Sequence, residues 1–163
     1  MRRTIGIAVL VGAMLALLGT TAPSFAAPGN NGDVKIAGTS IDGIPNNAPH
    51  QGCRFDLEFY NFDLGSPDAT YTFTLSAPTH SPGSDLLSTG DVAVGGGPLP
   101  GFGQLDAAAT VDLSDSLAAS GATASGQGFH VRLDVTGAGL HGGGSKSKTF
   151  WVAGDCGGDT LPG

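Results

Sequence analysis

The fold of this chain is decided by residues 53–60, which read Cys-Arg-Phe-Asp-Leu-Glu-Phe-Tyr. Apolar and polar side chains alternate along this stretch, with Phe55, Leu57 and Phe59 on one side and charged residues on the other. Successive side chains of a β-strand point to opposite faces of its sheet. The stretch is therefore predicted to be a strand with one buried and one solvated face.

The same two-residue period recurs on both sides of this stretch. It predicts further strands over residues 34–37, 69–75, 86–94, 105–113, 129–135 and 146–153. The pattern over 86–94 is weaker, and this segment is expected to be an edge or bulged strand. Strands 53–60 and 69–75 are expected to pair as an antiparallel hairpin around a turn at 63–68. In strand 105–113 the apolar face is predicted to start with Leu105, and a short helical turn with Ser114 as its N-cap is expected to follow.

Loops rich in glycine and proline separate the predicted strands, and 28 of the 163 residues are glycine. Short alternating runs divided by such loops are typical of an all-β protein. The sequence thus predicts an antiparallel β-sandwich of immunoglobulin-like class with about seven strands and one disulfide. The antibody topology itself is not implied, because its bridge joins the second and sixth strands.

The first 26 residues have the pattern of a secretory signal peptide. A basic start at Arg2 and Arg3 precedes an uncharged apolar run over 5–18, and Ser24 and Ala26 supply the small residues of a cleavage site after Ala26. The predicted organisation is a signal peptide over 1–26, a flexible leader over 27–33, the sandwich domain over 34–156 and a flexible tail over 157–163. The protein is expected to be secreted and extracellular, with association with the cell wall left open.

The predicted mature chain is acidic. The whole chain has a formal net charge of −7, and loss of Arg2 and Arg3 with the signal peptide lowers it to −9. Such a surface repels phosphate backbones and anionic membranes, so nucleic acid and membrane surfaces are not expected partners. No cofactor is expected either.

Two cysteines, Cys53 and Cys156, would reach an oxidising compartment together. Their simplest product is one disulfide between the strand that starts at Cys53 and the segment after the last strand. Free thiols or a metal pair are the alternatives, although no Cys-x-x-Cys spacing supports a zinc site.

Several stretches carry a resemblance to known proteins: 42–53, Phe59 to Asp63, Gly128 to Leu133, and Lys146 to Val152 followed by Cys156. Together they resemble a group of short secreted or wall-associated actinobacterial proteins of unknown function. The resemblance covers most of the mature chain and is loosest over 81–126. It implies an extracellular or surface location and brings no catalytic residues.

Motifs that would indicate catalysis or metal binding are missing from the sequence. The chain has no Gly-x-Ser-x-Gly nucleophile motif, and its four histidines lack metal-binding spacing. The one candidate for a hydrolytic site built from loops combines His50 with Asp56 and Glu58, which lie two apart on a strand face. No EF-hand loop occurs, and a weaker calcium site built from loops stays open.

Three residues are candidates for surface contact: His50, Tyr60 and Trp151. Exposed aromatic side chains mark carbohydrate or protein contacts when they are not packed under a neighbouring loop. The leading hypothesis is a non-enzymatic extracellular module that binds a protein or a glycan at the cell surface. A secreted hydrolase and a structural component of the cell envelope are the alternatives.

Overall fold

The computed structural model describes residues 32–36, 47–81, 84–96 and 103–156. The predicted signal peptide and tail lie outside these residues. Eight strands and one helix are formed in the described part: β1 (Asp33–Ile36), β2 (His50–Gln51), β3 (Arg54–Tyr60), β4 (Ala69–Leu75), β5 (Leu86–Val92), β6 (Leu105–Asp112), α1 (Ser114–Ser120), β7 (Phe129–Thr136) and β8 (Ser145–Val152).

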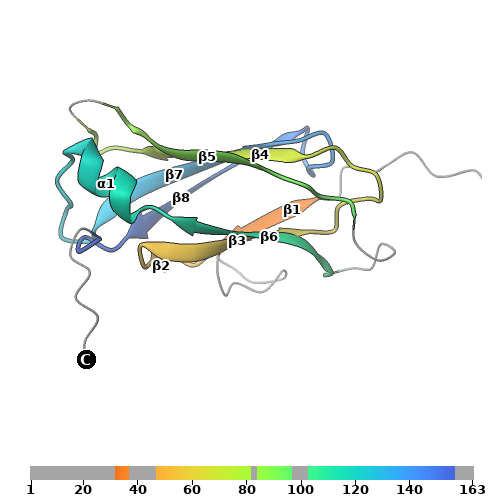
Figure 1. The fold of residues 1–163 in the computed structure, drawn as a ribbon, viewed down its shortest axis with the longest axis horizontal. Coiled ribbons are helices and arrows are strands. Elements are labelled where there is room, and N and C mark those ends of the chain that lie inside the picture. Colours follow the sequence, from red (N-terminus) through yellow and green to blue (C-terminus); the bar gives the residue numbers. More distant parts are fainter. Residues whose placement is uncertain (1–31, 37–46, 82–83, 97–102, 157–163) are drawn as a thin grey trace, which may run out of the picture.

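The strands form two sheets stacked as a sandwich (Figure 1). One sheet has the order β1-β3-β6 and the other the order β2-β8-β7-β4-β5. The mostly-β sandwich is confirmed, as is the edge position of β5, whose register against β4 shifts between Phe73 and Thr74. The described residues hold one strand more than the seven that were predicted.

The predicted hairpin between residues 53–60 and 69–75 is wrong. β3 pairs with β1 and β6, whereas β4 pairs with β7 and β5 in the opposite sheet. Alternation shows that each strand buries one face, but it does not show whether the two strands lie side by side or face to face. Here the chain crosses between the layers, and the two apolar faces meet in the core.

The additional strand, β2, lies between the predicted strands 34–37 and 53–60, where a loop was expected. It pairs in parallel with β8, so that His50 is level with Trp151. The backbone N–H of Trp151 donates to the carbonyl of Pro49 (2.9 Å), and that of Ala153 donates to the carbonyl of Gln51 (2.9 Å). A strand of two residues has no detectable period, so only its pairing with β8 defines it.

The helical turn after β6 is present as α1, but Ser114 is not its N-cap. Leu113 occupies the cap position, and no side chain caps the helix. Instead, the backbone N–H of Ser114 donates to Oδ1 of Asp112 (3.0 Å). The helix ends at Gly121, whose φ of 69° is in the left-handed region that favours glycine.

The core between the layers is centred on aromatic side chains. Phe55 of β3 packs edge-to-face against Phe73 of β4 and Phe150 of β8, with ring centroids 5.6 and 5.5 Å apart. The alternating residues of β7 are buried as predicted. Leu105 was expected to face inward and is 50% exposed instead. The register between β3 and β6 shifts between Phe59 and Tyr60, so Leu105 is level with the outward-facing Tyr60.

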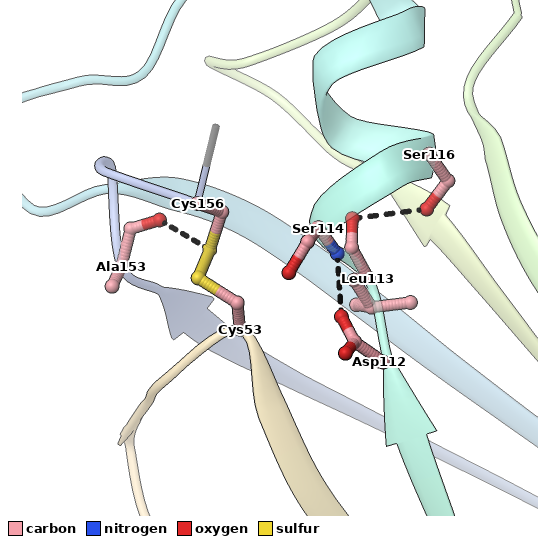
Figure 2. Close-up of a disulfide and its surroundings, with 7 residues drawn as sticks. All are labelled: Cys53, Asp112, Leu113, Ser114, Ser116, Ala153 and Cys156. Atoms are coloured by element: carbon pink, nitrogen blue, oxygen red, sulfur yellow. Dashed lines mark hydrogen bonds between the residues drawn. A yellow bond between two sulfur atoms is a disulfide. The ribbon is translucent and has the colours of Figure 1, made fainter. Parts of the chain in front are cut away.

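The predicted disulfide is confirmed between Cys53 and Cys156, with a Cα–Cα distance of 5.4 Å. It joins the start of β3 to the turn after β8 and therefore links the two sheets. Figure 2 shows it beside the beginning of α1, where the N–H of Leu113 donates to the carbonyl of Cys53 (2.9 Å). Sγ of Cys156 also contacts the carbonyl oxygen of Ala153 at 2.9 Å.

Candidate functional site

A row of three ring side chains crosses the outer face of the five-stranded sheet at one end. His50 of β2 is level with Trp151 of β8, and Trp151 is level with His130 of β7. Side chains of directly paired residues lie on the same face, so the row is continuous over three strands. His50 is exposed, and the other two rings are half-buried.

Trp151 and His130 are in direct contact. Their ring centroids are 4.6 Å apart and their planes are inclined by 33°, a tilted stack. Nδ1 of His130 lies 2.5 Å from the carbonyl oxygen of Ala77, which can only accept, so Nδ1 carries the hydrogen. The backbone N–H of His130 donates to Oγ1 of the buried Thr79 (2.8 Å), and these bonds fix the imidazole under the indole.

Hydroxyl-bearing side chains cover the rest of this outer face. Three cross-strand rows follow the row of rings. They include one exposed apolar residue, Leu86, which is level with Thr74. The other residues that they place on the outer face are Thr149, Arg132, Thr74, Ser147, Asp134, Thr72, Thr89, Ser145, Thr136, Thr70 and Asp91. Hydroxyls both donate and accept hydrogen bonds, so this face offers polar contacts in both directions.

One ion pair stands in the middle of the hydroxyl rows. Nε and Nη2 of Arg132 donate to the two carboxylate oxygens of Asp134, each at 2.8 Å. The hydrogen bond and the charge of Asp134 raise the pKa of Arg132. The hydrogen bond from Arg132 is the largest cause that lowers the pKa of Asp134, although partial burial opposes it. The two charges offset each other, so the centre of the face is close to neutral.

Tyr60, the third candidate for surface contact, is on the other sheet. It ends β3, and its hydroxyl donates to Oε2 of Glu58 (2.9 Å). Burial, followed by the hydrogen bond and the charge of Glu58, raises the pKa of Tyr60 to about 12. The structure thus brings together His50 and Trp151 and leaves Tyr60 on the opposite layer.

The residues of the hydrolytic alternative are also separated. Asp56 and Glu58 are on β3 of the three-stranded sheet, and His50 is on β2 of the five-stranded sheet. Oδ1 of Asp56 accepts from Oγ1 of Thr110 (2.8 Å). Within the described ranges, no three His, Cys, Asp or Glu side chains gather as a metal site would require.

A histidine–carboxylate pair that the sequence did not indicate lies in the loop between β4 and β5. Nδ1 of His80 is 3.1 Å from Oδ2 of Asp85, whose Oδ1 accepts from the N–H of Ser81 (2.7 Å). The hydroxyl of Ser81 donates to the carbonyl of Ser120 (2.6 Å) and so joins this loop to α1. These hydrogen bonds hold His80, Ser81 and Asp85 to one another and to α1, so their role is to fix the conformation of an exposed loop. His80 and Asp85 are five residues apart in a loop without periodicity, so the sequence carries no signal that pairs them.

A charged cluster joins the first and last strands. Nζ of Lys146 on β8 donates to Oδ1 of Asp33 on β1 (2.5 Å), and Nζ of the fully buried Lys35 is 3.9 Å from Oδ2. Burial raises the pKa of Asp33, but the hydrogen bond and charge of Lys146, the N–H of Val34 and the charge of Lys35 together lower it. Burial is the main cause that lowers the pKa of nearby Lys148. The cluster links the two sheets at one edge of the sandwich.

Over the part of the chain that the structure describes, no helix is long and apolar enough to cross a membrane. Comparison with protein-family models, with curated proteins and with solved structures gives no significant match.

Proposed function

We propose that this protein is a secreted, non-enzymatic binding module that holds a neutral glycan of the cell envelope on the outer face of its five-stranded sheet. The observation that carries the proposal is the row of His50, Trp151 and His130, placed beside rows of threonine and serine. The row gives an aromatic surface, and the rest of the face gives hydrogen-bonding groups.

The chemistry of this face suits a sugar polymer. An indole presents an apolar ring with one polar N–H, which matches the C–H face and the hydroxyl edge of a sugar ring. Binding sites of this kind use a few placed polar groups to fix orientation. A neutral ligand is favoured because Arg132 and Asp134 pair with each other and Asp91 is the remaining charge of the outer rows.

The other sheet is a poorer candidate for a binding face. Its outer side carries Asp56, Glu58 and Asp112 with Arg54, an acidic combination in a chain that is already strongly negative. Tyr60 on that side already donates its hydroxyl to Glu58. An acidic partner would therefore be attracted less to this face than to the five-stranded one. For a neutral glycan, the difference is that the one aromatic hydroxyl on this side is already engaged by Glu58.

An extracellular location is supported by two features. The first 26 residues carry the pattern of an export signal, and a disulfide joins Cys53 and Cys156. Disulfides persist in oxidising compartments and are rare in the cytosol. The resemblance to secreted or wall-associated actinobacterial proteins agrees with this location.

An immunoglobulin-like class is part of the proposal and is supported by the strand order. If β1 and β2 are the two halves of a split first strand, then β3, β4, β6, β7 and β8 take the places of strands B, C, E, F and G. The disulfide differs, because it joins the start of β3 to the turn after β8. Trp151 also differs, since it is on the outer face of the last strand rather than in the core.

Affinity electrophoresis tests the proposal. The purified protein is run in native gels that contain soluble neutral wall polysaccharide, and its migration should be retarded. Trp151→Ala should abolish the retardation, whereas Tyr60→Ala, which removes an aromatic from the opposite sheet, should keep it. Thr149→Glu adds a charge beside the row without touching the core, and it should also weaken binding. If the purified protein is retained only by a protein fraction of the envelope, its partner is a protein and not a glycan.

A further inference from the structure

One of the three rings on the outer face is carried by a strand of only two residues. β2 consists of His50 and Gln51, and His50 is level with Trp151 of β8. The N–H of Trp151 donates to the carbonyl of Pro49 (2.9 Å). The N–H of Ala153 donates to the carbonyl of Gln51 (2.9 Å). The net gain from two hydrogen bonds is small, and ordering the backbone that makes them costs a similar amount of entropy, so these bonds alone hold β2 weakly.

The disulfide fixes the point at which the chain leaves β2. One residue separates β2 from Cys53, whose carbonyl accepts from the N–H of Leu113 (2.9 Å) and is thereby anchored to the three-stranded sheet. Cys156 lies in the turn after β8, which belongs to the other sheet (Figure 2). The bond therefore ties the end of β8 to the residue where β3 begins. The hydrogen bond between Ala153 and Gln51 lies inside the small ring that it closes.

We propose that the disulfide between Cys53 and Cys156 positions the ring row: it holds β2 against β8 and so keeps His50 level with Trp151. Loss of the bond releases β2 while β7 and β8 stay paired, because a ladder of residue pairs joins those two strands along their whole length. The consequence for glycan binding rests on the function proposed above, whereas the placement of β2 does not.

The strand β8 supplies an internal reference for this effect. Successive N–H groups of a strand point to opposite sides within the plane of the sheet. Those of Trp151 and Ala153 point to β2, so those of Phe150 and Val152 point to β7. A disulfide that only restricts the unfolded chain changes the exchange of all four amides through global unfolding. A disulfide that holds β2 protects the first two in addition.

Amide hydrogen exchange of the oxidised protein and of the Cys53→Ser, Cys156→Ser double variant tests the proposal. The measured quantity is the protection of Trp151 divided by that of Phe150. In the double variant this ratio should fall at least about tenfold, because local opening then exposes the amides that face β2. Phe73→Leu weakens the buried core and keeps the disulfide, so its ratio should not fall.

A second variant keeps the test decisive if the double variant does not fold. A short glycine insertion between Gly154 and Asp155 retains the disulfide and lengthens only its connection to β8. The ratio should fall in this variant as well. An unchanged ratio in the double variant, or in the insertion variant where the double variant is unfolded, would overturn the proposal. The backbone pairing and the contact between Asn47 and Thr149 would then be sufficient to hold β2.

Glycan binding is measured separately on the same proteins. The double variant should be retarded less than the oxidised protein in gels that contain neutral polysaccharide, because His50 no longer stands beside Trp151. Full retardation together with a reduced exchange ratio would contradict a role of the disulfide in binding. Absence of retardation in the oxidised protein would overturn the glycan proposal alone, because the exchange ratio involves no ligand.

Discussion

Trp151 stacks on His130 with their ring centroids 4.6 Å apart, and this contact joins β8 to β7 on the outer face of the five-stranded sheet. The indole is held from one side by His130 and is level with His50 on the other. An aromatic ring fixed in this way can bind a ligand without first losing its own rotamer freedom.

His130→Ala should leave the fold intact and change the environment of the indole. Loss of the stack should cost about 0.5–1.5 kcal/mol, the usual worth of an aromatic contact. Because Trp151 is the one tryptophan of the chain, its emission maximum reports on this contact directly, and it should shift to longer wavelength. An unchanged emission spectrum would mean that the two rings do not stack in solution. His80→Ala, which changes a histidine in an exposed loop, is the matched control.

Reduction of the disulfide should destabilise the domain by about 2–5 kcal/mol. Cys53 and Cys156 are separated by 103 residues, so the bond restricts most of the unfolded chain. Urea unfolding of the oxidised protein and of the Cys53→Ser, Cys156→Ser double variant measures the difference. Equal midpoints and equal slopes would contradict this role.

The ion pair between Asp33 and Lys146 should make stability depend on pH at the acid end. The pKa of Asp33 is lower in the folded protein than its ordinary value of 3.8, so its contribution is complete above that value and is lost as the pH falls through the folded pKa. At pH 7, Asp33→Asn should be less stable than wild type by about 1–2 kcal/mol.

The difference between Asp33→Asn and wild type should shrink toward zero as the pH falls below 4, as urea unfolding at a series of pH values would show. Asp134→Asn is the control, because it breaks an exposed ion pair of small worth. A constant difference at all pH values would mean that the charge of Asp33 contributes nothing.

Phe73→Ala should destabilise the domain by about 3–5 kcal/mol. Its ring is completely buried and packs against both Phe55 and Phe150, so the change leaves a cavity between the two sheets. Thr72→Ala in the same strand alters only the outer face, and it should change stability by about 0.5 kcal/mol or less. Chemical denaturation of the two variants compares these effects. Similar losses in both would mean that β4 is not oriented with Phe73 inward.

Much of this architecture could be predicted from local patterns. The alternation in residues 53–60 and 129–135 gives the buried faces of β3 and β7, because every second side chain of a β-strand lies on the same face of its sheet. The pairing of strands could not be read in the same way. β3 and β4 are consecutive and both amphipathic, and only the packing of the whole core places them in different sheets.

The candidate site was predictable in part for the same reason. Parity along β8 shows that Trp151 points away from the core side of Phe150. Its meeting with His130 depends on the register between β8 and β7, and its position level with His50 depends on the two-residue strand β2.

The central claim is that the outer face of the five-stranded sheet binds a neutral glycan, and a fluorescence titration of Trp151 tests it most directly. Soluble neutral polysaccharide from the cell envelope is added to the wild-type protein, to Tyr60→Ala and to Thr149→Glu. We expect a saturable change in indole emission in the first two and a weakened response in Thr149→Glu. If the polysaccharide is retained by the protein while the emission of Trp151 stays unchanged, or if Tyr60→Ala abolishes binding, the ligand occupies another face and the claim is wrong.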